Sequence, residues 1–322
     1  MEAFHKLYQK ANPDLWQGRI DGEDRALHRW HQVVECVDLN SVKQMDNAIA
    51  ILGFCSDEGV RRNKGREGAK AAPPYLRKIL ANLPVHFGTH RKLIDVGDIH
   101  IQGYDLESAQ KALALAVSKI RSLNGFPLII GGGHEVTYGH FRGLSSDNKR
   151  IGVINIDAHL DMRPLEEGKG NSGTSFYQLE RELSSNGQQL HYMAIGIQDI
   201  ANTQGLLQYA ISKDVLIVKA DEIQAKRLDA VKAKIESFAA EIDELYLTLD
   251  MDVFAATYAP GVSAVAFQGL IPDHAFYELL TYIFKQPKLV SMDIAELNPR
   301  FDIDEHTGRL AASFIFKLLQ EI

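Results

Sequence analysis

Cysteine is scarce in this chain of 322 residues, which contains only Cys36 and Cys55, both within apolar stretches. Two cysteines cannot form the disulfide framework typical of small secreted proteins, so we expect a reducing, cytoplasmic environment. Long apolar runs are also missing: no stretch approaches the roughly 20 residues that cross a membrane, and the N-terminus has no apolar signal core. These absences argue against a disulfide-stabilised scaffold and against a membrane protein.

Positive charge is in deficit, with 35 basic against 42 acidic residues and a formal net charge of −7. No basic run is long enough for a nucleic-acid footprint, so we expect a small-molecule substrate and no nucleic-acid partner. The chain has no Pro/Gly/Ser-rich linker and no internal repeat, so residues 1–322 are predicted to form a single domain. The first 45 or so residues are polar and lack a clear strand, and we expect them to wrap this domain or to reach a neighbouring subunit.

Short β-rich apolar runs alternate with helical patterns along the rest of the chain. In the predicted helix 106–123, for example, Ala109, Leu113, Ala116 and Ile120 recur at helical spacing. Further helices are expected over 225–240, 274–284 and 311–322. The predicted strands are 48–53, 92–96, 126–130, 151–156, 191–195, 215–218, 245–249 and 289–294. About eight strands separated by helices predict an α/β fold, with a parallel sheet covered on both faces.

Three of the predicted strands are each followed directly by possible metal ligands. The pieces read GGGHE, NIDAHLD and LTLDMDVF, and they supply His134, Asp157, His159, Asp161, Asp250 and Asp252. The alternate spacing of the acids and the imidazole in NIDAHLD places them on one side of an extended chain. In an open α/β sheet, ligands bind at the carboxyl ends of the strands, which is where all three pieces lie.

These side chains are the kind that hold a pair of divalent ions. Carboxylate and imidazole ligands without thiolate suit Mn²⁺ or another borderline ion. Six ligands exceed the needs of one ion with a free water position, but fit two ions about 3.5–4 Å apart, which can make hydroxide from water near neutral pH. The alternative is that the acids cap helices and the histidines are core residues. The joint occurrence of all three pieces at strand ends favours the metal site.

The pieces GGGHEVTYG, NIDAHLDMR, LTLDMDVFAATYAPGVSA and SMDIAELNP, in this order and spacing, resemble the arginase/agmatinase family of ureohydrolases. The resemblance runs from about Ala48 to near the C-terminus. It implies the three-layer α/β/α fold of that family, with a central parallel sheet of eight strands. It also implies two Mn²⁺ per subunit, and relatives commonly form homo-oligomers.

The resemblance also implies a role for each ligand. His134 and Asp161 would belong to one ion, His159 and Asp252 to the other, and Asp157 and Asp250 would bridge the two. Asp161 is further expected to carry a proton to the departing amine. Glu296, in AELNP, matches the family glutamate that holds the amidine-like group of the substrate, where a carboxylate can accept paired hydrogen bonds.

One position departs from the guanidine-hydrolysing members, which carry a histidine in the loop after the DAHxD strand. Here the loop reads GNSGTSFYQL, with Ser172 in place of that histidine. This loop resembles the formimidoylglutamase branch, which splits N-formimidoyl-L-glutamate into glutamate and formamide in histidine breakdown. The segment DEGVRRNKGREGA resembles the substrate loop of that branch. We expect Ser172 to bind the substrate or a water molecule.

Formimidoylglutamate has two carboxylates, so a site for it needs cations, because arginine and carboxylate form paired hydrogen bonds. The candidates are Arg62, Lys64, Arg66 and Arg163, although RRNKGR can equally be a solvated basic loop. Three other interpretations stay open: an agmatinase, arginase or guanidino-acid hydrolase; a one-zinc deacetylase on a related fold; and a non-catalytic relative.

Overall fold

Eight parallel strands form the centre of one sheet in the computed structural model, which describes residues 2–145 and 149–322. Their order is β4-β3-β5-β10-β9-β6-β7-β8. The bounds are β3 Ala48–Cys55, β4 Lys92–His100, β5 Phe126–Ile130, β6 Ile151–Ile156, β7 His191–Ile197, β8 Leu216–Lys219, β9 Glu244–Asp250 and β10 Leu289–Ala295. Each predicted strand is therefore present, within a few residues at its ends.

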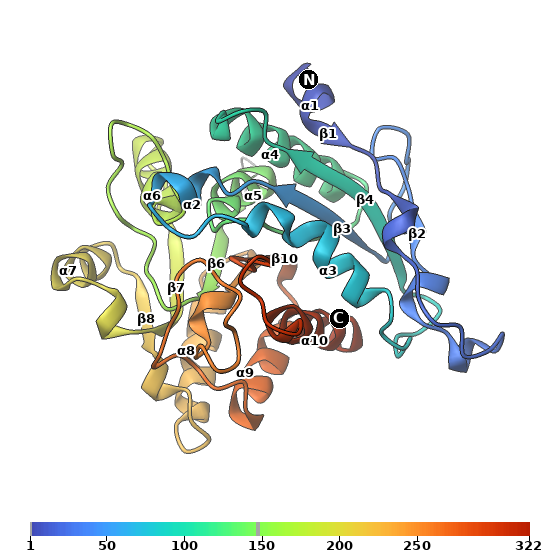
Figure 1. Ribbon diagram of the computed structural model, residues 1–322. Coiled ribbons are helices and arrows are strands. Elements are labelled where there is room, and N and C mark those ends of the chain that lie inside the picture. Colours follow the sequence, from blue (N-terminus) through green and yellow to red (C-terminus); the bar gives the residue numbers. More distant parts are fainter. Residues whose placement is uncertain (1, 146–148) are drawn as a thin grey trace.

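Helices cover both faces of the sheet, which confirms the predicted three-layer α/β/α fold (Figure 1). The apolar core on one face is shared with α1 Glu2–Leu7, α4 Leu106–Ser122, α5 Val136–Leu144, α6 Ser175–Ser185 and α7 Gln204–Ser212. The core on the other face is shared with α3 Ala72–Leu80, α8 Leu228–Ala240, α9 His274–Phe284 and α10 His306–Glu321. A short helix, α2 Glu58–Arg62, follows β3.

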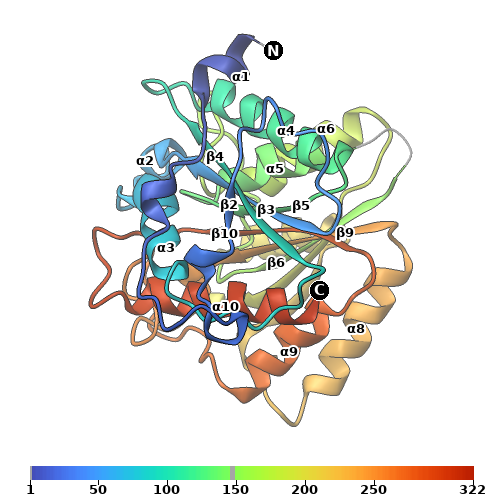
Figure 2. The ribbon, with the colours of Figure 1, turned by 90° about the vertical axis from the view of Figure 1, so that its right-hand side faces the viewer.

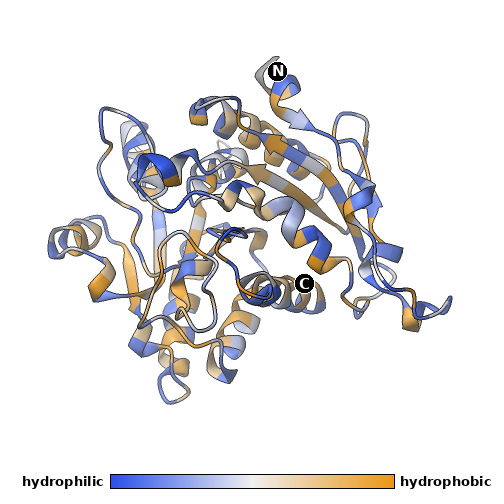
Figure 3. Ribbon diagram, in the orientation of Figure 1, coloured by the Kyte–Doolittle hydropathy of each residue, from blue (hydrophilic) through white to orange (hydrophobic). Residues whose placement is uncertain are grey.

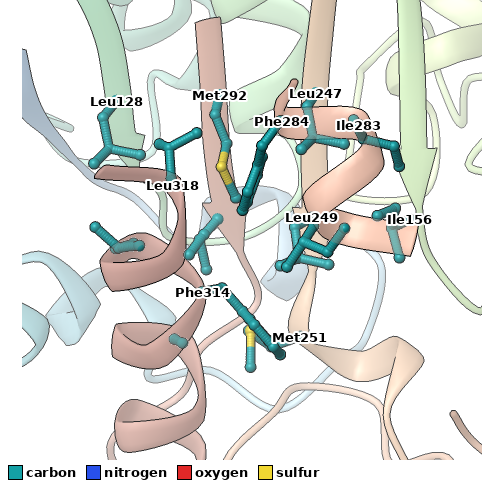
Figure 4. Close-up of a cluster of buried hydrophobic side chains, with 14 of the residues drawn as sticks. Leu128, Ile156, Leu247, Leu249, Met251, Ile283, Phe284, Met292, Phe314 and Leu318 are labelled. Carbon is teal, nitrogen blue, oxygen red and sulfur yellow. The ribbon is translucent and has the colours of Figure 1, made fainter. Parts of the chain in front are cut away.

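The strands are hydrophobic on both sides because both sides are buried. Every residue of β3, β5 after Phe126, β6 and β9 is buried, and the central strands are coloured mainly as hydrophobic in Figure 3. Figure 4 shows one of the two cores, where Met292 of β10 lies beside Phe284 of α9, and Phe314 of α10 lies beside Met251, just after β9.

Helix α10 begins at His306, earlier than the predicted start at residue 311. Its first turn is held by Asp302, whose carboxylate accepts hydrogen bonds from the backbone N–H groups of Thr307 and Gly308, both at 2.9 Å. Such a carboxylate satisfies N–H groups that have no partner within the helix. The apolar periodicity shows only the later part of the helix, because the first turn is polar.

The N-terminal segment adds two strands to the β4 edge, so the prediction that it lacks strands was wrong. β1 Tyr8–Gln9 pairs antiparallel with β4, and β2 Glu35–Cys36 pairs parallel with it. Figure 2 shows this blue segment running beside β4. Two residues are too few to produce the alternation by which a strand is recognised in a sequence. The pairing makes the sheet mixed and covers its exposed edge.

Buried charges hold this edge together. Arg77 of α3 is fully buried and donates to Asp95 Oδ1 at 2.9 Å and to Asp98 Oδ1 at 2.6 Å. Trp16 from the N-terminal segment donates its indole N–H to Asp95 Oδ2 at 2.7 Å. The segment is thus fixed to the sheet by a buried polar contact as well as by its apolar side chains.

Candidate metal centre

The carboxyl ends of β5, β6 and β9 bring the six predicted ligands together. In the sheet, β5 and β9 flank β10, and β6 follows β9, so these ends are close neighbours. The GGG turn after β5 contributes His134, and Gly132 within it lies so near the Ser56 carbonyl that an added Cβ would be 1.7 Å from the oxygen. Only glycine permits that approach. Five of the ligands are buried and one, His159, is partly exposed: His134, Asp157, His159, Asp161, Asp250 and Asp252.

The first group of ligand atoms surrounds His134 Nδ1. This nitrogen lies 2.8 Å from Asp161 Oδ2, 3.1 Å from Asp157 Oδ2 and 3.2 Å from Asp250 Oδ2. His134, Asp157 and Asp161 each offer an atom within 4.8 Å of the others, which is a spacing that can hold one ion. His134 and Asp161, which we predict to bind the same ion, are both in this group; their shared ion stays a prediction.

The second group surrounds His159 Nδ1, which lies 3.3 Å from Asp252 Oδ2 and 3.4 Å from Asp157 Oδ1. Its three members, Asp157, His159 and Asp252, again offer atoms within 4.8 Å of one another. Asp157 faces His134 with one oxygen and His159 with the other, so it belongs to both groups. That is the arrangement expected of a bridging carboxylate.

Several carboxylates are buried close together in this site, so their mutual repulsion must be offset by positive charge. Burial, and then the charges of Asp252 and Asp157, raise the pKa of Asp250 well above its usual value. Burial and the Asp157 charge likewise raise the pKa of Asp161. Asp252 Oδ1 is buried without a hydrogen-bond partner among the described residues. Divalent ions would satisfy these oxygens and offset the repulsion, so the donor set fits a pair of such ions.

Glu296 lies beside the ligands at the end of β10. Its Oε1 accepts a hydrogen bond from the backbone N–H of His134 at 2.7 Å, whereas its buried Oε2 has no partner within the described part of the chain. Burial, and then the charges of Asp252 and Glu135, raise the pKa of Glu296 to about 8. One oxygen is therefore held in place and the other is left to receive a ligand.

A cavity of about 320 Å³ opens above this group. Its lining includes five of the six ligands, together with Glu296, Ser172, Lys64, Arg66 and Arg163. Three lining residues other than glycine have positive φ: Asp161 (47°), Lys64 (62°) and Glu296 (63°). Such backbone costs about 1–3 kcal/mol per residue and persists where the surrounding fold imposes it, typically at functional sites.

Of the four basic candidates, Lys64 and Arg163 are exposed at the cavity, whereas Arg66 and Arg62 are held by contacts within the protein. Neither Lys64 nor Arg163 has an ion-pair partner within residues 2–145 and 149–322. Arg66 also lines the cavity, but its guanidinium donates to the carbonyls of Val262 and Ser263 and lies over the Phe301 ring, 4.2 Å from its centroid. Arg66 therefore holds two chain segments together.

Arg62 does not line the cavity. Its guanidinium donates to Glu58 at 2.8 Å, to Glu107 at 2.6 Å and to the carbonyls of Tyr104 and Gly170. With its donors occupied in this way, it is placed to hold α2 against α4 and not to bind a substrate. Its charge and its place in a segment that resembles a substrate loop selected it from the sequence, but neither shows where a side chain points.

Asn63 is one of the cavity residues that were missed from the sequence. It lies between the basic candidates, lines the cavity and donates a hydrogen bond to Ser172 Oγ at 3.1 Å. Its position within RRNKGR was the available signal, but only the charged members of that segment were chosen.

The fold and the site together define a hydrolase-type metal centre: a parallel α/β sheet with two sets of carboxylate and imidazole ligands sharing one aspartate. The model of the arginase family matches residues 47–320, so the chain belongs to the arginase family.

Individual proteins and solved structures are similar to this chain over most of its length. A formimidoylglutamase of Clostridium tetani (strain Massachusetts / E88) is 40% identical over 98% of this chain and 96% of its own length. A formimidoylglutamase of Geobacillus sp. (strain WCH70) is 42% identical over 97% and 96%. Among solved structures, the Bacillus subtilis formimidoylglutamase has a TM-score of 0.81 and 25% identity, covering 94% of each chain. Trypanosoma cruzi formiminoglutamase with Mn²⁺ has a TM-score of 0.76 and 30% identity, covering 88% of this chain and 96% of that one.

Along the described residues, no helix is both long and apolar enough to cross a membrane.

Proposed function

We propose that this chain is a binuclear manganese hydrolase that cleaves N-formimidoyl-L-glutamate to L-glutamate and formamide. The observation that carries the proposal is a single cavity whose lining includes five of the six metal ligands, Glu296 and two cations, Lys64 and Arg163, which have no ion-pair partner among the described residues. The formimidoylglutamase names of the relatives support the choice of substrate, and the Mn²⁺ in the T. cruzi structure supports the choice of metal.

The ligand set fits two divalent ions, held by His134 with Asp161 and by His159 with Asp252, with Asp157 between them. When bound, such a pair supplies hydroxide at neutral pH and stabilises negative charge that develops on the substrate.

The protein side chains position the substrate and move its protons. The unpartnered Glu296 Oε2 accepts hydrogen bonds from the formimidoyl nitrogens and directs the amidine carbon toward the ligands. Water adds to that carbon, and the bond from the carbon to the glutamate nitrogen breaks. Asp161, a ligand that also lines the cavity, takes the proton of the attacking water and delivers it to that nitrogen. The products are formamide and the free amino group of glutamate.

The cations select the dianionic substrate. Lys64 and Arg163 lie at the cavity without carboxylate partners of their own in the described structure, so each can receive one carboxylate of formimidoylglutamate. The cationic tail of agmatine would instead meet like charge, which disfavours its binding. Ser172 lies where we expect a histidine in guanidine-hydrolysing relatives; it lines the cavity and accepts a hydrogen bond from Asn63 at 3.1 Å.

A product assay tests the proposal. The Mn²⁺-loaded protein is incubated separately with formimidoylglutamate, agmatine and arginine, and formamide, urea and the amine products are measured. We expect equal amounts of formamide and glutamate from the first compound. Urea from agmatine or arginine at a higher kcat/KM would contradict the proposal and would assign the chain to the guanidine hydrolases. Its assembly as a homo-oligomer and its cytoplasmic location stay predictions.

A further inference from the structure

A buried row of polar side chains leads from His134 away from the cavity and into the sheet. We propose that Asp293 and Thr248 are positioning residues, which fix His134 in the form that binds a metal ion and so strengthen one of the two ion sites selectively. The inference rests on the metal centre of the proposed function and is independent of its substrate.

The first step is the difference between the two ring nitrogens of His134. Nδ1 faces only carboxylate oxygens, the nearest being Asp161 Oδ2 at 2.8 Å. Nε2 points the other way and lies 2.9 Å from Thr248 Oγ1. A histidine that binds an ion through Nδ1 must carry its proton on Nε2, so in that form Nε2–H donates to Thr248.

The second step is the direction of the next hydrogen bond. Thr248 Oγ1 donates to Asp293 Oδ1 at 2.6 Å. A hydroxyl group has a single proton and a carboxylate only accepts, so Thr248 has no proton left for His134 and must accept from it. Thr137 Oγ1, 3.3 Å from Thr248 Oγ1, then donates to Thr248 as well. The row thus selects one tautomer of His134, the one that leaves Nδ1 free for an ion.

The third step is what holds Asp293. It is fully buried on β10, and its Oδ2 accepts from the Tyr246 hydroxyl and lies 2.7 Å from His140 Nδ1. His140 in turn lies 2.5 Å from Ser291 Oγ through its Nε2. Among the described residues, the hydrogen-bond partners of the Asp293 carboxylate are His140, Tyr246 and Thr248, none of them a predicted metal ligand. These partners hold a carboxylate two hydrogen bonds away from the His134 ring. Carboxylates in this place fix ligand orientation and tautomer in known metal sites.

The second imidazole ligand lacks such support. The His159 side chain is 27% exposed, and within residues 2–145 and 149–322 its Nε2 makes no hydrogen bond. In the described part of the chain, its ion-pair partners are the acids that would share its ion, Asp157 and Asp252. We therefore expect the two ions to depend differently on Thr248 and Asp293: the one at His134 strongly, and the one at His159 little.

The test is a titration of metal-free protein with Mn²⁺, followed by calorimetry and by metal analysis after dialysis. In the Thr248→Val variant, which keeps the shape but removes the hydroxyl, one of the two ions should bind roughly 10- to 100-fold more weakly. Asp293→Asn should weaken the binding of the same ion, because the amide can no longer serve as a charged acceptor. Thr248→Ser keeps the hydroxyl and should retain wild-type affinity for both ions.

Thermal unfolding of the metal-free proteins separates a positioning role from a loss of fold stability. If Thr248 only positions His134, the Thr248→Val and Thr248→Ser variants should have the same Tm. Equal affinities in wild type, Thr248→Val and Asp293→Asn would overturn the inference, and so would an equal loss at both ions. If Asp293→Asn fails to fold, the Thr248 pair alone decides. The titration uses no substrate, so its outcome does not depend on whether the protein cleaves formimidoylglutamate. A wild-type protein that binds no Mn²⁺ would overturn both the metal centre and the inference.

Discussion

Asn63 donates a hydrogen bond from Nδ2 to Ser172 Oγ at 3.1 Å and so joins two loops that are 109 residues apart in the chain. One loop follows β3 and carries Lys64; the other follows β6 and its ligands. Both residues line the cavity. The contact ties the loop that carries Lys64 to the loop that follows the ligands after β6. It does so through Ser172, the position at which the sequence resemblance leads us to expect a histidine in guanidine hydrolases.

Replacing Asn63 by alanine should therefore raise the KM for formimidoylglutamate more than it lowers kcat. The loop would lose one hydrogen bond, worth about 0.5–1.5 kcal/mol, which corresponds to a change of roughly 2- to 10-fold. Steady-state kinetics on the Mn²⁺-loaded protein measures this. Ser172→Ala should reproduce the effect, and a double variant should lose little more than either single one. Fully additive losses would show that the two residues do not act together.

Replacing Lys64 or Arg163 by alanine should raise the KM for formimidoylglutamate by about 10-fold or more, because each change leaves a substrate carboxylate without a charged partner. The metal content should stay unchanged, since neither residue is one of the six predicted ligands. Lys169→Ala is the matched control: it removes a cation from the loop of Arg163, but Lys169 does not line the cavity. An unchanged KM for Arg163→Ala would remove that residue from the site.

The buried carboxyl group of Glu135 should make the free energy of unfolding depend on pH. It is fully buried, accepts hydrogen bonds from Gly59 N–H at 2.9 Å and Ser56 Oγ at 3.1 Å, and burial raises its pKa from 4.5 to about 7. Between these values the folded state holds a proton that the unfolded state has released, so stability falls as the pH rises from 4.5 to 7.

Glu135→Gln should remove this component. The difference in unfolding free energy between wild type and variant should change by roughly 3 kcal/mol across that pH window, with the wild type losing stability as the pH rises. Urea unfolding of the metal-free proteins at several pH values measures it. A difference that stays constant with pH would mean that Glu135 titrates normally.

Arg77 should be the most costly charge to remove. Arg77→Met leaves Asp95 and Asp98 buried without their cation, and the loss of one partner of a buried pair costs about 3–5 kcal/mol. The exposed pair Arg309–Glu305 is the comparison, since Arg309→Ala should cost less than about 1 kcal/mol. Denaturant unfolding of both variants tests the contrast, and similar losses would contradict it.

The sequence predicted most of what depends on local pattern. Most strands of the parallel sheet contain a short apolar run, although β4 and β10 also carry buried aspartates. The His134 and Asp157 pieces are recognisable because glycine turns and alternating acids follow such runs directly. What it could not predict depends on contacts made across the fold. The strand at Tyr8 is set by its edge position beside β4, and Arg62 is held by Glu107, which is distant in the chain. The row from His134 to Asp293 likewise joins the turn after β5 to the strands β9 and β10, so no local pattern marks it.

The central claim is that two ions act together in this site, and stepwise metal loading tests it most directly. Formamide release from formimidoylglutamate is measured while Mn²⁺ is titrated into the metal-free protein, with Asp157→Ala as a control that lacks the shared ligand. We predict that activity appears chiefly as the second equivalent binds and that the control stays inactive. Full activity at one equivalent, or in the absence of metal, would contradict the binuclear account.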